Sequence, residues 1–394
     1  MVPSFISGLF LPNIIFFFFV TFNLIFFNKE IINIIRNHSK VFSIFIFFCL
    51  FLIISSIISD NVMHSLGSSA LYFSFSVYVI SISFLFDNRK YRIIFLFFCT
   101  VTMFFLSLDS IFEFFNGKNI LGYSSIEGRI ASLFNNRWLL GRYLIYFLPL
   151  LIGIFFIELP HLYKGFKIFF CTTIFLCCLS IIFSGERAAF ILFFIFLFLI
   201  FLYLFKKVNK KLKFIFLLII LGFLVIPFLF PVTSQRLQHN FILYATSLDF
   251  SKNQYYSMWL TSLKMFIDNP VFGIGPNNFR NSCNELPYYV SNWSCSTHPH
   301  NTSFQILSEI GVIGFILVYS VFIYFCLKLI QIIKTNHFSH KTIGFYSICS
   351  AKVLYLFPLM ITGNFFLSWY GFIYYLAVGF FFVYKDNILK EVNV

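Results

Sequence analysis

The sequence predicts an all-α membrane protein, a polytopic transmembrane helical bundle that forms a single integral membrane domain over residues 1–394. Hydrophobic residues make up 60% of the chain and charged residues only 11%, whereas soluble chains carry about 25% charge. The chain contains 65 Phe, which a soluble domain could not keep out of water. Several apolar runs also reach the ~20 residues that cross a bilayer core.

Eleven apolar stretches predict the membrane spans, and splitting one of them would give twelve. Each is placed to within a few residues. They are 5–27, 41–59, 69–86, 93–109, 138–157, 166–184, 188–205, 214–230, 303–327, 342–362 and 365–384.

The loops between these stretches alternate in charge, and this alternation predicts their sides. The segment "KKVNKKLK" at 206–213 carries five lysines. The positive-inside rule therefore places it, and the C-terminus, in the cytoplasm. Residues 110–137, the turn at 184–187 and the segment 231–302 then lie on the other side. Eleven spans also place the N-terminus outside, and a re-entrant segment over 1–27 is the alternative.

The loop at 231–302 is about 70 residues long and its charges nearly cancel. Long loops of this kind usually carry function. The net charge of +14 could indicate nucleic-acid binding, but the basic residues concentrate in short loops, as in cytoplasmic membrane loops. We therefore expect membrane lipids as partners and no nucleic acid.

Cysteine usage agrees with this sidedness. Seven of the nine cysteines lie in apolar stretches, and only Cys283 and Cys295 fall in the outer loop. In an oxidising compartment these two are expected to form a disulfide. Two free thiols, or zinc ligands together with His298 and His300, are the alternatives.

The motif "HPHN" at 298–301 directly precedes an apolar stretch. Asn301 or Thr302 suits a helix N-cap, and "TSFQ" at 302–305 fits a capping box, so Asn301 has a purely structural interpretation. A helix N-terminus disfavours imidazolium, which would hold His300 neutral. A neutral imidazole can act as a general base. Simple solvent exposure is the alternative for these histidines.

Arginines on the outer side predict an anionic ligand. Arg187 lies between two apolar stretches, where charge is costly and usually marks a site. A pair with Glu186 or a snorkelling side chain is the alternative. Arg129, Arg137 and Arg142 lie in or near the loop before the span at 138–157. The planar fork of arginine suits phosphate, although an ordinary polar loop would also carry such residues.

The sequence contains no Walker motif, no DxD pair and no HExxH motif. A histidine and several arginines on the outer face suit a reaction on a lipid-borne diphosphate. The arginines would neutralise the leaving group and the histidine would activate an acceptor hydroxyl. We expect no metal ion and no cofactor.

The segment "HPHNTSFQILSEIGVIGF" resembles the signature of the O-antigen ligase family of bacterial membrane proteins. "MWLTSLKMFIDNPVFGIGPNNF" is similar to that family's Trp-containing segment, and "SGERAAF" and "GRIASLFNNRWLLGRYL" are similar to its arginine elements. The resemblance runs over residues 125–380. The matching positions are Arg129, Phe134, Asn135, Asn136, Arg187, Trp259, Pro270, Gly273, Gly275, Phe279, His300, Asn301, Leu307, Glu309, Gly311 and Gly314.

The chain departs from the family at one position. The family often carries an arginine four residues before the Trp, where this chain has Tyr255, and Lys252 or Arg236 are the candidates to replace it. The family's usual twelve spans also exceed the eleven counted.

The resemblance implies transfer of an undecaprenyl-diphosphate-linked glycan to the lipid A core at the periplasmic face of the inner membrane, inverting and metal-independent. His300 would deprotonate the acceptor, and Arg187 with Arg129 or Lys252 would hold the diphosphate. The remaining expected substrate-binding residues are Arg137, Tyr255, Trp259, His298 and Asn301.

Other activities fit the same resemblance. O-antigen polymerases and protein O-oligosaccharyltransferases share the donor and differ in the acceptor. A transporter of the lipid-linked glycan and an inactive membrane scaffold are further alternatives.

Overall fold

The computed structural model describes residues 10–26, 32, 35–36, 39–125, 128–134, 137–230, 253–335, 338–366 and 368–392. Within these ranges the regular structure is helical and no β-strand is present. The α-helices are α1 (Phe10–Phe26), α3 (Ser39–Ile58), α4 (Val62–Leu85), α5 (Arg89–Asn116), α6 (Leu140–Glu158), α7 (Lys164–Phe183), α8 (Arg187–Phe205), α9 (Lys210–Leu229), α11 (Gln254–Asp268), α12 (Phe279–Ser282), α13 (Thr302–Lys334), α14 (His340–Tyr355) and α15 (Ser368–Val392).

This architecture confirms the predicted all-α polytopic membrane fold. Each of the eleven apolar stretches overlaps one helix. Within the described residues, eight helical segments are long and apolar enough to cross a membrane, and α1 and α3 contain shorter apolar segments. The number of eleven crossings stays a prediction.

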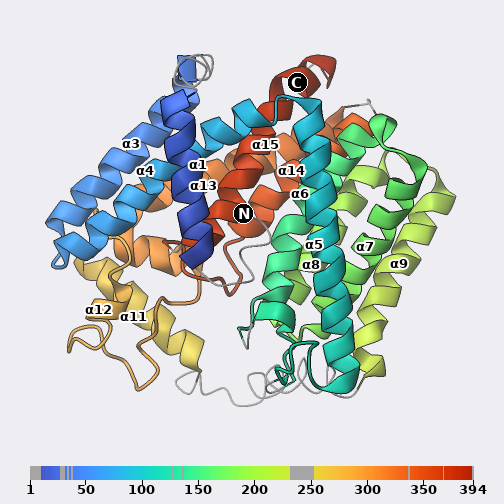
Figure 1. The fold of residues 1–394 in the computed structure, drawn as a ribbon. Helices are drawn as coiled ribbons and strands as arrows, with labels where there is room; N and C mark the ends of the chain where they lie inside the picture. The colour runs from blue at the N-terminus through green and yellow to red at the C-terminus, as the bar shows by residue number, and fades with distance from the viewer. Residues whose placement is uncertain are drawn as a thin grey trace.

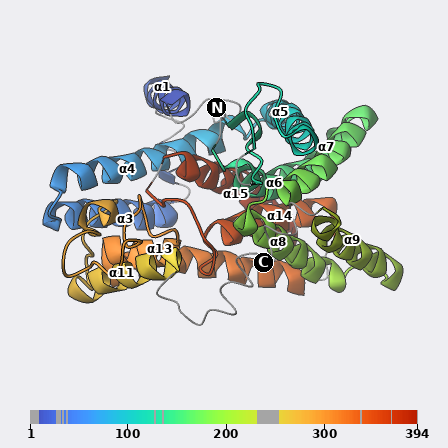
Figure 2. The ribbon, with the colours of Figure 1, turned by 90° about the horizontal axis from the view of Figure 1, so that it is seen from below.

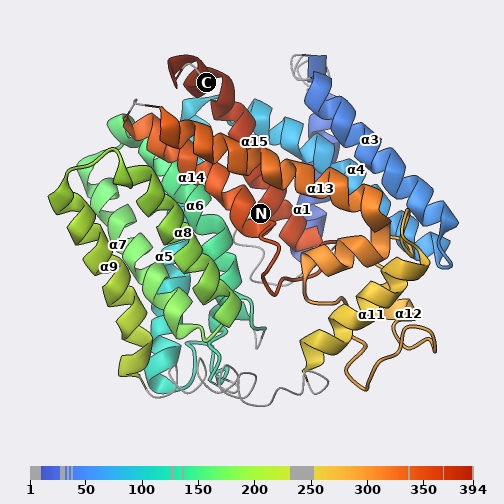
Figure 3. The same cartoon turned by 180° about the vertical axis from the view of Figure 1, so that it is seen from behind.

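The helices form two groups joined through a central layer. Figure 1 shows α1, α3 and α4 on one side and α5, α7, α8 and α9 on the other, and Figure 2 shows α6, α14 and α15 between them. The long helix α13 runs across both groups (Figure 3). In this layer α14 packs along α6, while α15 packs on α4 and α14. The C-terminus lies at the end of the bundle opposite to α11 and α12 (Figure 1).

The contact between α6 and α14 depends on two glycines. A Cβ on Gly153 would collide with the carbonyl of Gly344, and a Cβ on Gly344 would collide with that of Gly153. Small residues let membrane helices approach to backbone contact. The hydroxyl of Ser347 also donates to the Pro149 carbonyl across this contact at 2.7 Å.

The predicted span at 342–362 ends earlier than expected, because α14 stops at Tyr355. Pro358 follows closely, and a proline disfavours helical geometry at the residue before it. Residues 356–366 instead form an irregular segment. This segment leads into α15 and supplies backbone groups to the polar site described below.

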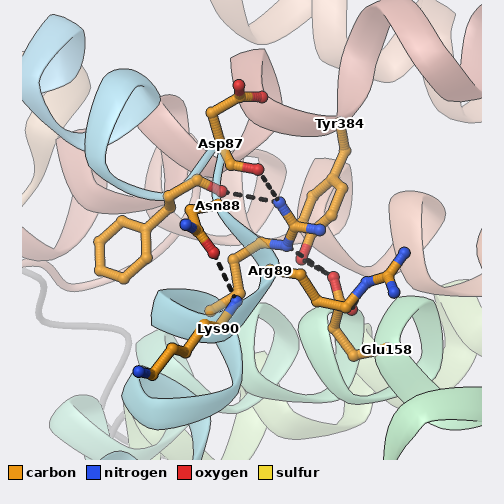
Figure 4. Close-up of polar contacts among 8 residues, drawn as sticks. Asp87, Asn88, Arg89, Lys90, Glu158 and Tyr384 are labelled. Carbon is orange, nitrogen blue, oxygen red and sulfur yellow. Dashed lines mark hydrogen bonds and ion pairs between the residues drawn. The ribbon is translucent and has the colours of Figure 1, made fainter.

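A buried ion pair between Arg92 and Glu158 links helices near the C-terminal part of α15 (Figure 4). The Glu158 carboxylate accepts from Arg92 Nε at 2.6 Å and from the Tyr384 hydroxyl at 3.1 Å. Arg92 also donates to the carbonyls of Phe86 and Asp87. The pair therefore joins the α4–α5 turn, the end of α6 and α15.

Two arginines share this carboxylate but differ in burial. The Arg92 side chain is 13% exposed, whereas Arg89 is 56% exposed and its Nε lies 3.8 Å from Glu158. Arg92→Gln should cost about 3–5 kcal/mol of stability because it leaves a buried carboxylate poorly compensated. Arg89→Gln, the matched control, should cost at most about 1 kcal/mol. Unfolding midpoints in detergent measure both, and equal losses would contradict a structural role for the buried pair.

Candidate functional site

The polar site lies at the N-terminal end of α13, where α11 packs against it. The chain between α12 and α13 is tied by a disulfide that joins Cys283 to Cys295. The bond closes the segment directly before the "HPHN" motif. It restricts the conformations of the loop that carries His298 and His300.

A break in α13 anchors the neighbouring loop. Gly311 has φ 65° and ψ −169°, which is not helical. Instead of continuing the helix ladder, Val312 N donates to Pro270 O, and the amides of Ile274 and Gly275 donate to Ser308 O and Glu309 O. A Cβ at Gly311 would collide with the backbone of Val271. The loop is thus hydrogen-bonded into the gap in the helix.

The fully buried Glu309 holds the same loop through its side chain. One carboxylate oxygen accepts from Phe279 N at 2.9 Å, and the other accepts from Asn277 N at 3.1 Å and Gln305 Nε2 at 2.9 Å. A buried carboxylate needs such partners. Two of the matching residues in the Trp-containing segment, Gly275 and Phe279, are thus bound to Glu309 through their backbone amides.

Asn301 is the N-cap of α13. It is one of the two residues, Asn301 and Thr302, that the sequence suggested for this position. Its side-chain oxygen accepts from Ser303 N and Phe304 N, and its nitrogen donates to Pro358 O and Met360 O. The side chain thereby ties α13 to the irregular segment after α14.

The expected capping box at 302–305 is wrong. Gln305 does not fold back on the first turn, because its nitrogen donates to Glu309 and Asn364 and its oxygen accepts from Phe365 N. Asn364 and Phe365, which hold the buried Gln305 amide, are distant in the sequence. A local sequence motif therefore cannot predict these contacts.

The two histidines lie side by side, with ring centroids 4.2 Å apart. His298 Nε2 contacts Thr362 O at 3.1 Å and its Nδ1 contacts the Thr297 hydroxyl at 2.9 Å. A carbonyl only accepts, so Nε2 carries the proton, and in the neutral ring Nδ1 accepts from Thr297. Both nitrogens of His298 are therefore engaged.

The side-chain partner of His300 is a hydroxyl group, which is not restricted to one hydrogen-bonding role. Its Nε2 lies 3.1 Å from the Ser296 hydroxyl, which can donate or accept. Its backbone has φ 56°, a left-handed conformation that is uncommon for a residue with a side chain. The backbone bond from Thr362 N to His300 O, 2.9 Å long, helps to hold this conformation.

Both histidines are held neutral. Burial is the largest cause that lowers the pKa of His298 to about 3 and that of His300 to about 4. The neighbouring His300 also lowers the pKa of His298. The positive charge of Arg142 lowers both pKa values, while hydrogen bonds to the Thr362 backbone act in the opposite direction. Burial and Arg142 thus act in the direction expected of the helix N-terminus, whose own contribution stays a prediction.

A second group of charges surrounds Glu186. Arg142 Nε donates to its carboxylate at 3.0 Å and Gly141 N at 2.8 Å, and Arg129 lies near enough for its charge to act on Glu186. Arg187 follows Glu186 as the first residue of α8. The buried Glu186 thereby fixes Arg142, whose charge also reaches both histidines.

The other expected substrate-binding residues lie as follows. Tyr255 and Trp259 are on α11, where the Tyr255 ring lies 5.9 Å from the His300 ring and Trp259 Nε1 donates to Pro299 O at 3.1 Å. Arg137 is exposed. Lys252, together with Asn135 and Asn136, lies outside the described residues.

The structure therefore brings together His300, His298, Tyr255 and Arg142, with Arg129 and Arg187 close to the carboxylate that holds Arg142. Sequence reasoning grouped Arg142 with two other arginines but did not select it. A signal was present, since an arginine at the edge of an apolar stretch usually marks a site. The sequence suggested Glu186 as a partner for Arg187, and in the structure its carboxylate forms an ion pair with Arg142.

The site combines a neutral histidine, which can act as a base, with nearby arginines. A neutral imidazole can take a proton, and arginines stabilise phosphate oxygens. Within the described part of the chain, no three His, Cys, Asp or Glu side chains lie close enough to hold a metal ion.

Fold and site together define a polytopic membrane protein with a histidine–arginine site at one end of its bundle. Residues 172–319 match the model of a family described as O-antigen ligase, which supports assigning the chain to that family. The matched range includes Arg187 and His300. No curated protein matches the chain. The family consists of membrane enzymes of the glycosyltransferase type, so the assignment supports an O-antigen ligase-like function in general.

The pH dependence of transfer should report on His300. In the free protein the pKa of His300 is about 4. This value places the acidic limb of the pH profile of kcat/KM well below pH 6.5. Arg142→Gln removes a neighbouring positive charge, which favours imidazolium and raises the pKa, so the limb should move towards 6.5. Arg280→Gln, which removes an exposed charge elsewhere, should leave it in place. An unchanged limb in Arg142→Gln would exclude this coupling.

Proposed function

We propose that the protein transfers a glycan from an undecaprenyl-diphosphate carrier to a hydroxyl of the lipid A core. The reaction takes place at the periplasmic face of the bacterial inner membrane, and it inverts the anomeric carbon without a metal ion. The proposal rests on the family match at residues 172–319 and on the placement of a neutral histidine beside arginines.

The observation that carries the proposal is the coupling of His300 to Arg142. The charge of Arg142 acts on His300, although the two residues are far apart in the sequence and lie on different helices. An acceptor hydroxyl at His300 and a diphosphate at the arginines would then be neighbours. This is the arrangement that transfer between two bound substrates requires.

The steps follow from these positions. His300 takes the proton of the acceptor hydroxyl, and the oxygen forms a bond to the anomeric carbon. The bond between that carbon and the diphosphate oxygen breaks, and the leaving diphosphate keeps the electron pair. Arg187, Arg142 and Arg129 neutralise the developing negative charge.

Binding of the donor would itself raise the pKa of His300. A diphosphate near Arg142 offsets the charge that lowers the pKa of His300. A nearby anion also favours imidazolium directly. The pKa therefore rises in the complex towards the pH at which a general base is effective.

The remaining residues have supporting roles in this proposal. Tyr255 and Trp259 form one wall beside His300, with Tyr255 in place of an arginine. His298 and Asn301 fix the loop and the start of α13 through their hydrogen bonds. Lys252 and Arg137 would add positive charge for the donor.

Two related activities use the same donor. An O-antigen polymerase or a protein O-oligosaccharyltransferase would differ only in which hydroxyl reaches His300. A transporter of the lipid-linked glycan is the weaker alternative, because it would need charges along a path through the spans, whereas the cationic site gathers at one end.

His300→Asn tests the base, because Asn tolerates the left-handed backbone but provides no imidazole. Loss of a general base costs about 10²–10⁴-fold in rate, and the variant should still accumulate in the membrane. The control is His161→Asn, which changes an exposed histidine after α6. Near-normal transfer by His300→Asn would contradict the mechanism.

The acceptor is tested in a strain that lacks the gene, by a gel of surface glycolipids run beside the polyprenyl-linked pool. Polymer should accumulate on the carrier while the lipid A core carries no O-chain. A core with a single repeat unit would instead identify a polymerase, and a change in glycoproteins alone would identify protein as the acceptor.

A further inference from the structure

An apolar groove runs between α3, α13 and α15, and its lining also includes Leu356 and Phe365 of the irregular segment after α14. Its cavity of about 450 Å³ falls in the ~300–1,000 Å³ range of small-molecule sites. In Figure 3, α3 and α13 converge near α12 and diverge towards the C-terminal end of α15. Apolar side chains dominate the lining, among them Ile44, Phe48, Val321, Val378 and Phe381.

The length of the groove matches one leaflet of a membrane. Its lining on α15 extends from Tyr374 to Lys385, which is roughly 16 Å of helix. Half of a bilayer's hydrocarbon core is about 15 Å. The groove therefore has the length of an acyl chain that belongs to a single leaflet.

The end of the groove at the C-terminal part of α15 is positively charged. Lys385 lines it, and Lys328 on α13 lies near enough for the two charges to repel. Neither lysine forms a salt bridge with another described residue. Each lies over an aromatic ring of its own helix, Tyr324 for Lys328 and Phe382 for Lys385. Two neighbouring ammonium groups that form no salt bridge within the described residues favour an anionic ligand.

We propose that this groove binds an anionic phospholipid, with one acyl chain between α3, α13 and α15 and the phosphate at Lys328 and Lys385. Basic pockets between membrane helices on the cytoplasmic side bind anionic head groups, and the positive C-terminal tail puts this end of α15 in the cytoplasm. Lys385 lies in the C-terminal part of α15, and this part of the helix lies at the end of the bundle opposite to α11 and α12 (Figure 1). Its phosphate site is therefore distinct from the proposed donor site.

Native mass spectrometry of the full chain in detergent, titrated with phosphatidylglycerol or phosphatidylcholine, tests the head-group contact. Phosphatidylglycerol should bind more tightly, and Lys328→Gln with Lys385→Gln should weaken it roughly 30-fold. The control is Lys210→Gln with Lys211→Gln, which removes the same charge from exposed positions outside the groove. Equal binding of both lipids, or equal loss in both double variants, would overturn the proposal.

Val378→Trp tests the acyl contact, because it fills the groove and leaves both lysines in place. Phosphatidylglycerol binding should fall while the binding of inorganic phosphate does not change. Retained lipid binding would show that the lysines attract an anion at the surface without the groove. Preferential binding of a neutral polyprenol, unaffected by the double lysine substitution, would assign the groove to the carrier chain and contradict the proposal.

Discussion

The exchange of backbone hydrogen bonds at Gly311 is the constraint on which the site depends. A membrane helix cannot leave amides and carbonyls without partners in a region that excludes water. The break in α13 creates such groups, and residues 270–275 satisfy them. Glu309 adds side-chain bonds to the same loop. The loop, the kinked helix and the start of α4, which meets the loop through Ser65 and Asn278, therefore form one unit that supports the histidines.

The site itself joins parts of the chain that are distant in sequence. His300 belongs to the turn before α13, Arg142 to α6, and Thr362 to the irregular segment after α14. The central layer of α6, α14 and α15 brings these parts together, and the glycine contact between α6 and α14 sets how closely they approach. The chemistry at one end of the bundle thus relies on helix packing at its centre.

Much of this arrangement was visible in the sequence, and the missing parts have identifiable causes. Helix positions followed from apolar runs, and the N-cap at Asn301 followed from local preference. The capping box failed because Gln305 has buried partners that no local motif contains. The end of α14 could have been found, since Pro358 marks it. The proximity of Arg142 to the histidines could not be predicted, because hydropathy indicates where a helix lies and not which helix is its neighbour.

The left-handed backbone at His300 has a consequence for the assembly of the protein. The conformation is tied to Thr362 N, and Asn301 is tied to Pro358 and Met360. All three partners lie beyond the range 172–319 that the family model matches. A fragment limited to that range would contain His300 but lack the groups that shape its turn. During biosynthesis the site therefore becomes complete only after the chain beyond α14 has been inserted, and the protein cannot become active earlier.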